Sequence, residues 1–271
     1  KSRLQTAQCQ SLPFTSPTCS ERQLEPAGLL RLRGLLCATH VVRGTRRLGF
    51  GTYQAANYDE LIDCPVEMGT FELGRFEVLG VPHEIAVTGC VPRLDMDRLT
   101  ADLARVCEEQ IRLFEPRSKK APFGRYTFMT MAVGDGRGGL EHRNSTALLC
   151  RRDDLPFKGM NDTTEGYRNF LGLASHEYFD SWNVKRIRPA AFVPYDLTQE
   201  NYTRLLWAFE GFTSYYDDLM LCRSGLLTEN EFFPDWGGRD LAGDLGRALG
   251  LGVAIENDAD AAALAAARWG A

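Results

Sequence analysis

His176 and Asp180 lie four residues apart in the segment His176-Glu177-Tyr178-Phe179-Asp180. Positions i and i+4 of an α-helix lie on one face, one turn apart, so a helix here directs both side chains the same way. Glu177 is then beside them. An imidazole and a carboxylate at this spacing can bind one metal ion, and the neighbouring Glu can act as a general base.

The segment approximates the His-Glu-x-x-His pattern of zinc peptidases, in which two imidazoles bind the metal. Asp180 occupies the position of the second His, and a carboxylate oxygen can also bind zinc. Its side chain is shorter than an imidazole, so the helix or the ion would have to shift. Because His, Glu and Asp on one helix face are also typical of a solvated surface, these five residues leave both interpretations open.

Glu210 is the candidate for a third ligand. It lies 34 residues after His176, in the largely apolar and aromatic stretch Leu206–Tyr216. A carboxylate buried in such a stretch must be paired or metal-bound. Two neighbouring helices, one with His-Glu and one with Glu, would form a two-helix zinc site. A salt bridge to a base of the Val184–Pro189 segment is the alternative.

The segment Gly138–His142 follows a predicted strand and contains Glu141. A strand edge can hold an extended peptide by main-chain hydrogen bonds, and a carboxylate there can bind a free α-amino group. A glycine turn with an exposed Glu is the alternative. Residues Gly134–Gly139 also match GxGxxG, but a strand-like stretch follows them where a nucleotide site needs a helix, which disfavours a nucleotide-dependent oxidoreductase.

Periodic patterns predict the elements that must position these residues. Short strands fill residues 49–92, and further strands are predicted at Tyr126–Val133 and around Ser145–Cys150. Helices are predicted at Asp97–Phe114, Thr164–Trp182 and Gln199–Arg223, the last with Asp196 as its N-cap and Gly225 at its end. We find no internal repeat.

Composition narrows the function classes. The 271 residues are 44% hydrophobic and 25% charged, which is typical of a globular chain. A net charge of −5 disfavours broad binding to nucleic acid, and no apolar run is long enough to span a membrane. The eight cysteines form no CxxC pair. This pattern favours scattered, mostly buried thiols in a reducing compartment over disulfides. A reducing compartment slightly favours the cytoplasm over the periplasm, but the sequence does not decide between the two.

Longer motifs resemble one family closely. The string His176–Pro189 resembles the bacterial glycyl aminopeptidases, members of which often carry a PDZ domain, and three further segments do so too: Gly138–His142, Arg152–Pro156 and Trp207–Asp218. Tyr58–Asp63 and Pro65–Gly69 resemble the end of the family's N-terminal β domain. The likeness covers about residues 49–230.

The resemblance implies an α+β fold, with a thermolysin-like zinc-peptidase domain of mixed sheet and helices preceded by part of an all-β domain. We therefore expect a partial β domain at 1–92, a catalytic domain at 93–236 and a weakly specified Ala- and Gly-rich tail at 237–271. The implied activity is that of a zinc-dependent aminopeptidase on peptides with a small N-terminal residue such as Gly. The oligomeric state is left open.

The resemblance also assigns roles to individual residues. His176 and Glu210 would bind Zn²⁺, Glu177 would be the general base, and Gly139 and Glu141 would bind the substrate, with Glu141 near its amine. We expect Asp180 to be the remaining ligand.

Three departures from the family pattern qualify these expectations. The family has His at the position of Asp180, the likeness ends after about Glu231, and no PDZ domain follows. Tyr215 and Tyr216 are candidate hydroxyl donors, although their helical spacing on an apolar element is more typical of core residues. We expect an impaired zinc aminopeptidase, and the alternative is an inactive peptidase fold that binds peptides or serves structurally.

Overall fold

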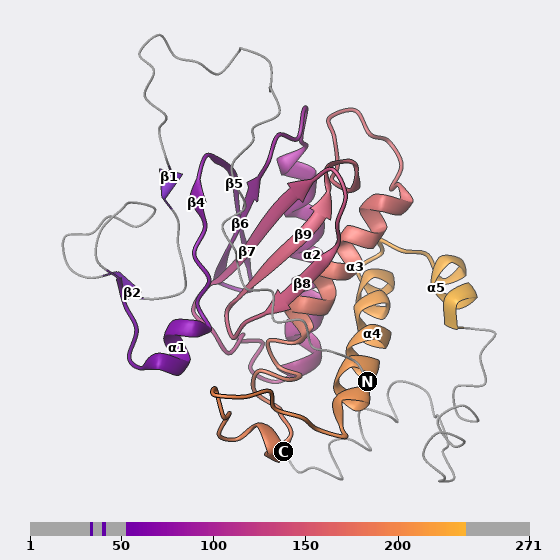
Figure 1. Cartoon of the computed structure of the whole chain (residues 1–271). Helices are drawn as coiled ribbons and strands as arrows, with labels where there is room; N and C mark the ends of the chain where they lie inside the picture. The colour runs from indigo at the N-terminus through magenta and orange to yellow at the C-terminus, as the bar shows by residue number, and fades with distance from the viewer. Residues whose placement is uncertain (1–32, 35–39, 42–52, 237–271) are drawn as a thin grey trace, which may run out of the picture.

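The computed structural model describes residues 33–34, 40–41 and 53–236, and its centre is one five-stranded mixed sheet (Figure 1). The strands lie in the order β5-β6-β7-β9-β8. Their bounds are β5 Phe71–Val78, β6 Val81–Thr88, β7 Tyr126–Val133, β8 Gly138–Glu141 and β9 Ser145–Arg151. The strands predicted at 126–133 and 145–150 are therefore confirmed, and the GxGxxG segment leads into a strand rather than a helix.

Strand direction changes at both sides of the sheet. β6, β7 and β9 are parallel to one another, while β5 pairs antiparallel with β6 and β8 pairs antiparallel with β9. The parallel strand β6 is buried from His83 to Val87, as expected for a strand covered on both faces. β8 is at the edge of the sheet, where its outer main chain faces no other strand among the described residues.

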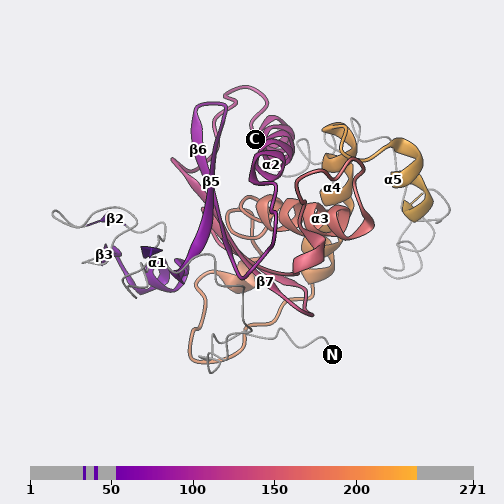
Figure 2. The same cartoon turned by 90° about the horizontal axis from the view of Figure 1, so that it is seen from above.

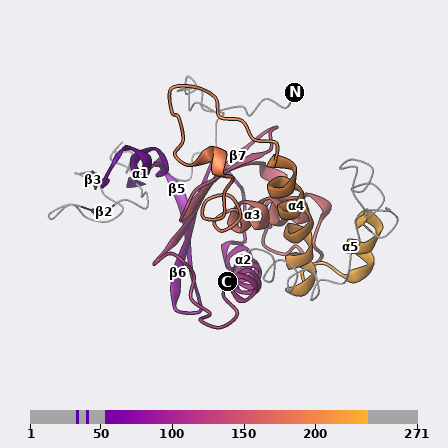
Figure 3. The same ribbon diagram turned by 90° about the horizontal axis from the view of Figure 1, so that it is seen from below.

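Three long helices cover one face of this sheet, and α1 with the short strands lies beyond the other (Figures 2 and 3). The long helices are α2 (Met96–Phe114), α3 (Glu165–Phe179) and α4 (Leu206–Arg223). Asp95 caps α2, and the apolar face Leu99, Leu103, Val106 and Ile111 is buried against the sheet. The predicted helix at 97–114 is therefore confirmed.

α3 is the central helix, packed against α2, α4, β8 and β9. Thr164 caps its start by accepting a hydrogen bond from the Tyr167 amide. Aromatic rings anchor its underside: Tyr178 contacts Tyr126 at 4.6 Å between ring centroids, and its hydroxyl lies 2.9 Å from Nε2 of the buried His83 on β6. This packing fixes the rotation of α3 about its own axis.

α4 begins later than the sequence pattern predicts. Asp196 does not cap it: its carboxylate accepts hydrogen bonds from Thr198 and Gln199 in a local turn, and helical bonding starts only at Leu206. An Asp side chain that accepts a hydrogen bond from a neighbouring backbone amide stabilises a local turn, and this turn competes with capping of a helix. The end is as predicted, with Gly225 in the left-handed region at φ +70°.

The remaining elements are short. They are β1 Arg33–Gly34, β2 His40–Val41, β3 Tyr53–Gln54, α1 Tyr58–Ile62, β4 Met68–Gly69, the 3₁₀ turns η1 Arg152–Asp154 and η2 Ala190–Phe192, and α5 Glu229–Trp236. β1 pairs with β4 and β2 with β3, each antiparallel. No described helix is long and apolar enough to cross a bilayer.

The fold is a mixed α/β arrangement, as the predicted class requires. Strands β5 and β6, from the predicted 1–92 domain, join the same sheet as β7–β9 of the predicted 93–236 domain. Most of 1–48 and the whole predicted 237–271 tail lie outside the described residues. Among the described cysteines, Cys107 and Cys150 are buried thiols and Cys222 is a half-buried one. Cys90 is disulfide-bonded, so the predicted preference for thiols over disulfides does not hold there.

Candidate active site

His176 is at the centre of a group of acidic side chains from α3 and α4. Its Nε2 atom lies 3.7 Å from Asp180 Oδ2 and 3.5 Å from Glu210 Oε2. Its Nδ1 atom lies 2.9 Å from Asp217 Oδ2. His176 therefore lies beside both other residues predicted as ligands, and a fourth residue contacts its other ring nitrogen.

These separations fit a metal ion. Ligand atoms of a tetrahedral ion with bonds of about 2.0–2.2 Å lie about 3.3–3.6 Å apart, close to the 3.5 and 3.7 Å measured at His176 Nε2. The hydrogen bond from Nδ1 to Asp217 leaves Nε2 as the free lone pair for a metal, since carboxylates commonly orient ligating imidazoles in this way. His176, Asp180 and Glu210 thus have the donor types of a zinc site, and His176 lies at ligand-to-ligand distance from each carboxylate. The described residues whose ligand atoms all lie within 4.8 Å of one another are instead Glu141, Glu177 and Asp180.

Asp180 is built into the interface between the two helices. It is the C-cap residue of α3, it is 4% exposed, and its Oδ1 accepts a 2.7 Å hydrogen bond from Thr213 Oγ1 of α4. The Asn183 amide donates to the same Thr213 hydroxyl and to the Phe209 carbonyl, at 3.1 Å each. One oxygen of Asp180 is fixed to α4, and the other faces His176.

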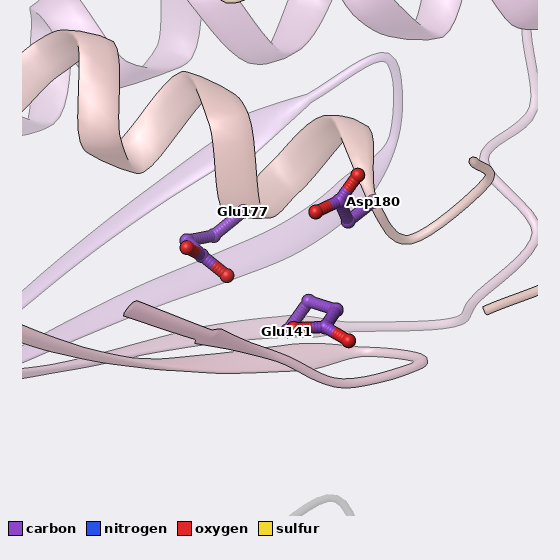
Figure 4. A group of neighbouring side chains, drawn as sticks. All are labelled: Glu141, Glu177 and Asp180. Atoms are coloured by element: carbon purple, nitrogen blue, oxygen red, sulfur yellow. The ribbon is translucent and has the colours of Figure 1, made fainter. Parts of the chain in front are cut away.

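Glu177 projects from α3 toward the edge strand β8 (Figure 4). It is 5% exposed, and its Oε2 has no hydrogen-bond partner. It lies directly on Gly139, where an added Cβ would lie 2.7 Å from Glu177 Cγ and overlap its carboxylate. A buried carboxylate oxygen without a donor is costly, and binding a cation or a water is the usual compensation.

Glu141 extends from β8 to face Glu177 and Asp180 (Figure 4). One carboxylate oxygen from each of these three residues lies within 4.8 Å of the others. An all-carboxylate group of this kind attracts a cation, whether a metal ion or an ammonium group. The acidic group shares Asp180 with the His176 group, so the two form one continuous site between α3, α4 and β8.

Gathering these charges in a buried site has an electrostatic cost. Burial raises the pKa of Glu177 to about 8, with the nearby charge of Glu141 adding to the rise. Burial likewise raises the pKa of Asp180 to about 9, against the opposing charge of His176. Burial alone would lower the pKa of His176, but hydrogen bonds to Asp217 and Glu210 outweigh it and raise the value to about 11.

The site also corrects some expectations from the sequence. Glu210 is not buried: its side chain is 52% exposed, because it opens from α4 toward solvent. Among the described ion pairs it contacts His176 and not a base of the 184–189 segment. Tyr215 and Tyr216 pack against the core, with Tyr216 stacked on Phe179 at 5.3 Å, in agreement with the core interpretation.

Two site residues were missed in the sequence. Asp217 and Thr213 both lie on α4, and they follow Glu210 by seven and three residues. Seven residues are close to two helical turns, so Asp217 is on the same face as Glu210. This spacing could have identified Asp217 from the sequence. No sequence pattern identifies Thr213, because its role depends on Asp180 being a carboxylate.

Comparison with known proteins finds one family model and a similar solved structure. The chain is similar to an aminopeptidase N family protein from Idiomarina loihiensis, with a TM-score of 0.70 and 45% sequence identity. Residues 169–243, which include His176 and Glu210, match the model of the M61 glycyl aminopeptidases. These two matches support the assignment of this chain to the M61 glycyl aminopeptidases.

The match to the Idiomarina structure is partial in extent. It covers 74% of this chain and 33% of the Idiomarina protein, so the chain spans about a third of that relative's length. No curated protein matches the chain. The resemblance seen in the sequence is confirmed at the level of the family.

Proposed function

We propose that this chain is the catalytic part of a zinc-dependent aminopeptidase that removes a small N-terminal residue, such as Gly, from peptides. The match to the M61 family model supports peptidase activity. The observation that carries the proposal is that His176 Nε2 lies 3.7 Å from Asp180 and 3.5 Å from Glu210, beside the buried carboxylate of Glu177.

His176, Asp180 and Glu210 are the residues that would hold the metal, and Asp217 and Thr213 would orient two of them. Zinc bound there supplies a Lewis acid that polarises the scissile carbonyl and lowers the pKa of water. Imidazole and carboxylate donors suit zinc better than they suit calcium or magnesium, which prefer oxygen ligands alone.

Glu177 is the proposed general base. Its unpartnered Oε2 takes a proton from the attacking water and later gives that proton to the leaving amine, so the residue ends in its starting state. The water oxygen forms the new bond to the carbonyl carbon as the C–N bond breaks. The packing of Glu177 against Gly139 holds the carboxylate in one orientation during both transfers.

Strand β8 is the proposed docking edge for the peptide. A peptide that adds to this edge by main-chain hydrogen bonds places its α-ammonium at Glu141 and its second residue toward Gly138. A cavity of about 500 Å³ opens at that end, lined by Arg137, Arg168 and Asp217 among others. It gives room for the part of the peptide beyond the scissile bond.

Hydrolysis of glycine p-nitroanilide by the purified chain tests the proposal, with Glu177→Gln as the control and zinc measured after dialysis. We expect about one zinc per chain and a loss of at least about 100-fold in kcat for the variant. Equal rates in the two proteins would remove the proposed role of Glu177. Zinc-free protein that still binds glycyl peptides would favour the alternative, a peptidase fold that binds without catalysis.

A further inference from the structure

Lys185 is a cation that lies beside Glu141. Its Nζ lies 3.6 Å from Glu141 Oε1 and 3.4 Å from Asp63 Oδ1, so one ammonium group bridges two carboxylates. Glu141 lies on β8, Lys185 lies in the segment between α3 and α4, and Asp63 is the C-cap residue of α1. The Lys185 side chain is 20% exposed, so the bridge is largely shielded from solvent.

The backbone around Lys185 is fixed at several points. Its own amide donates to the Asp180 carbonyl at 3.0 Å, which ties it to the C-terminal end of α3. Arg186 donates to the carbonyls of Arg143 and Pro122, at 2.9 and 3.2 Å. Val184 has φ +128°, a conformation that a β-branched residue rarely adopts. Such strain persists only where surrounding contacts enforce it.

Asp63 is equally well held. Its Oδ2 accepts a 3.1 Å hydrogen bond from the Arg143 amide, and its Oδ1 lies 3.4 Å from His142 Nδ1. His142 and Arg143 directly follow Glu141 in the chain. Burial opposes ionisation of Asp63, but the contacts with His142, Lys185 and Arg143 outweigh it and lower its pKa. Asp63 is therefore a fixed negative charge to which Lys185 is anchored.

Glu141 thus has a cation on one side and carboxylates on another. Its carboxylate contacts Lys185, and it also lies within 4.8 Å of Glu177 and Asp180, which repel it. Without a neighbouring positive charge, Glu141 would turn away from the other two carboxylates toward solvent. The side chain is 27% exposed, so such a rotation has room.

We propose that Lys185 is a positioning residue, which together with Asp63 holds Glu141 in the orientation that binds the free α-ammonium group of a peptide. This inference rests on the proposed function, because it deepens the role of Glu141 in that site. The ammonium of the substrate takes the side of Glu141 that faces Glu177 and Asp180, where the negative charge is unbalanced. Lys185 keeps the opposite side.

Binding measured without turnover tests this role separately from catalysis. In the zinc-loaded Glu177→Gln background, calorimetry gives the Kd of glycinamide, which has a free amine, and of N-acetylglycinamide, which lacks one. We expect Lys185→Met to raise the Kd of glycinamide about tenfold and Lys185→Arg to leave it within about threefold of the parent. The Kd of the acetylated ligand should not change in either variant. Asp63→Asn should also raise the Kd of glycinamide.

Lys158→Met is the matched control, because Lys158 is an exposed lysine on the surface outside the site. Thermal melting and zinc content must be the same in all variants compared, and Asp63→Asn replaces Lys185→Met if the latter is unfolded. A Kd for glycinamide that is equal in Lys185→Met and Lys158→Met overturns the proposal, as does an absence of glycinamide binding to the parent. Binding that depends on Lys185 in a chain without hydrolysis would support it while contradicting the proposed catalysis.

Discussion

Gly139 of β8 lies in direct contact with Glu177 of α3, with no space between them for a side chain. A Cβ at position 139 would lie 2.7 Å from Glu177 Cγ and would overlap the carboxylate. The main chain of the edge strand therefore sets the position of the proposed base. The space between this strand and this helix is therefore too small to admit one methyl group.

Replacement of Gly139 by Ala should displace Glu177 and lower kcat/KM by about 100-fold, since a shift near 1 Å in a reacting group has an effect of this size. The melting temperature should change little, because Gly139 is exposed and lies in a strand. Steady-state kinetics and thermal melting make the comparison. Gly124→Ala is the control, since a Cβ at 124 meets nothing within 4 Å and the residue lies outside β8. If both variants keep the parent's activity, the contact does not position the base.

Asp180→His should increase both zinc retention and turnover. A neutral imidazole in place of the carboxylate removes one negative charge from the site, which restores the Lewis acidity of the metal. We expect zinc to remain bound through longer dialysis, and kcat to rise by about tenfold or more. Metal analysis and kinetics on the same preparations decide it. Asp180→Ala should lose zinc, and an Ala variant that retains as much metal as the parent would show that Asp180 is not a ligand.

Asp217→Asn should weaken zinc binding or activity by about 10–100-fold, the usual effect of losing a carboxylate that orients a ligating imidazole. Asn keeps the shape of Asp but can present its amide nitrogen to Nδ1, which no longer fixes the ring. A competition titration with a chelator gives the zinc Kd. Asp97→Asn, on the exposed first turn of α2, controls for the loss of one charge. The role of Asp217 is wrong if both variants have the same zinc Kd.

His83 should make the folded state sensitive to acid. Its Nδ1 faces the Val81 carbonyl, so it must donate there, and burial lowers the His83 pKa from 6.5 to about 4. A lowered pKa means that the stabilising effect is complete above pH 6.5 and is lost as the pH falls toward 4. At 1.36 kcal/mol per pKa unit, the full shift corresponds to about 3 kcal/mol.

His83→Gln removes this titration. Between pH 7 and pH 4.5 the parent should lose about 2 kcal/mol more unfolding free energy than the variant does. Urea unfolding of both proteins at the two pH values gives the difference. The variant is expected to be less stable at pH 7, because Gln packs poorly beside Phe76 and Tyr178, but only the change with pH matters. Parallel losses in the two proteins would contradict a buried neutral His83.

The sequence predicted the elements whose periodicity is strong. α2 and α3 begin and end within a few residues of the predicted bounds, because buried apolar side chains recur at helical spacing and Asp95 and Thr164 cap them. The start of α4 was missed by several residues. Asp is a common N-cap residue, but here the Asp196 carboxylate accepts a hydrogen bond within a local turn. The sequence alone does not show whether such a residue caps a helix or stabilises a turn.

The sequence named side chains that lie around His176, but not the contacts that hold them. His176 lies 3.7 Å from Asp180 and 3.5 Å from Glu210, whereas the burial expected of Glu210 was wrong. The contacts of Thr213, Lys185 and Asp63 depend on how α4, the preceding segment and α1 pack in three dimensions. No period in the sequence relates residues 63, 141 and 185, so pattern analysis has no means of pairing them.

β8 has only four residues and a single neighbouring strand among the described residues, yet it carries both Gly139 and Glu141. Fraying of this short strand would therefore release the support of the base and the recognition of the amine in one event. A peptide that pairs with the open edge would protect the strand from fraying. Substrate binding and assembly of the working site would then be thermodynamically linked, with each favouring the other.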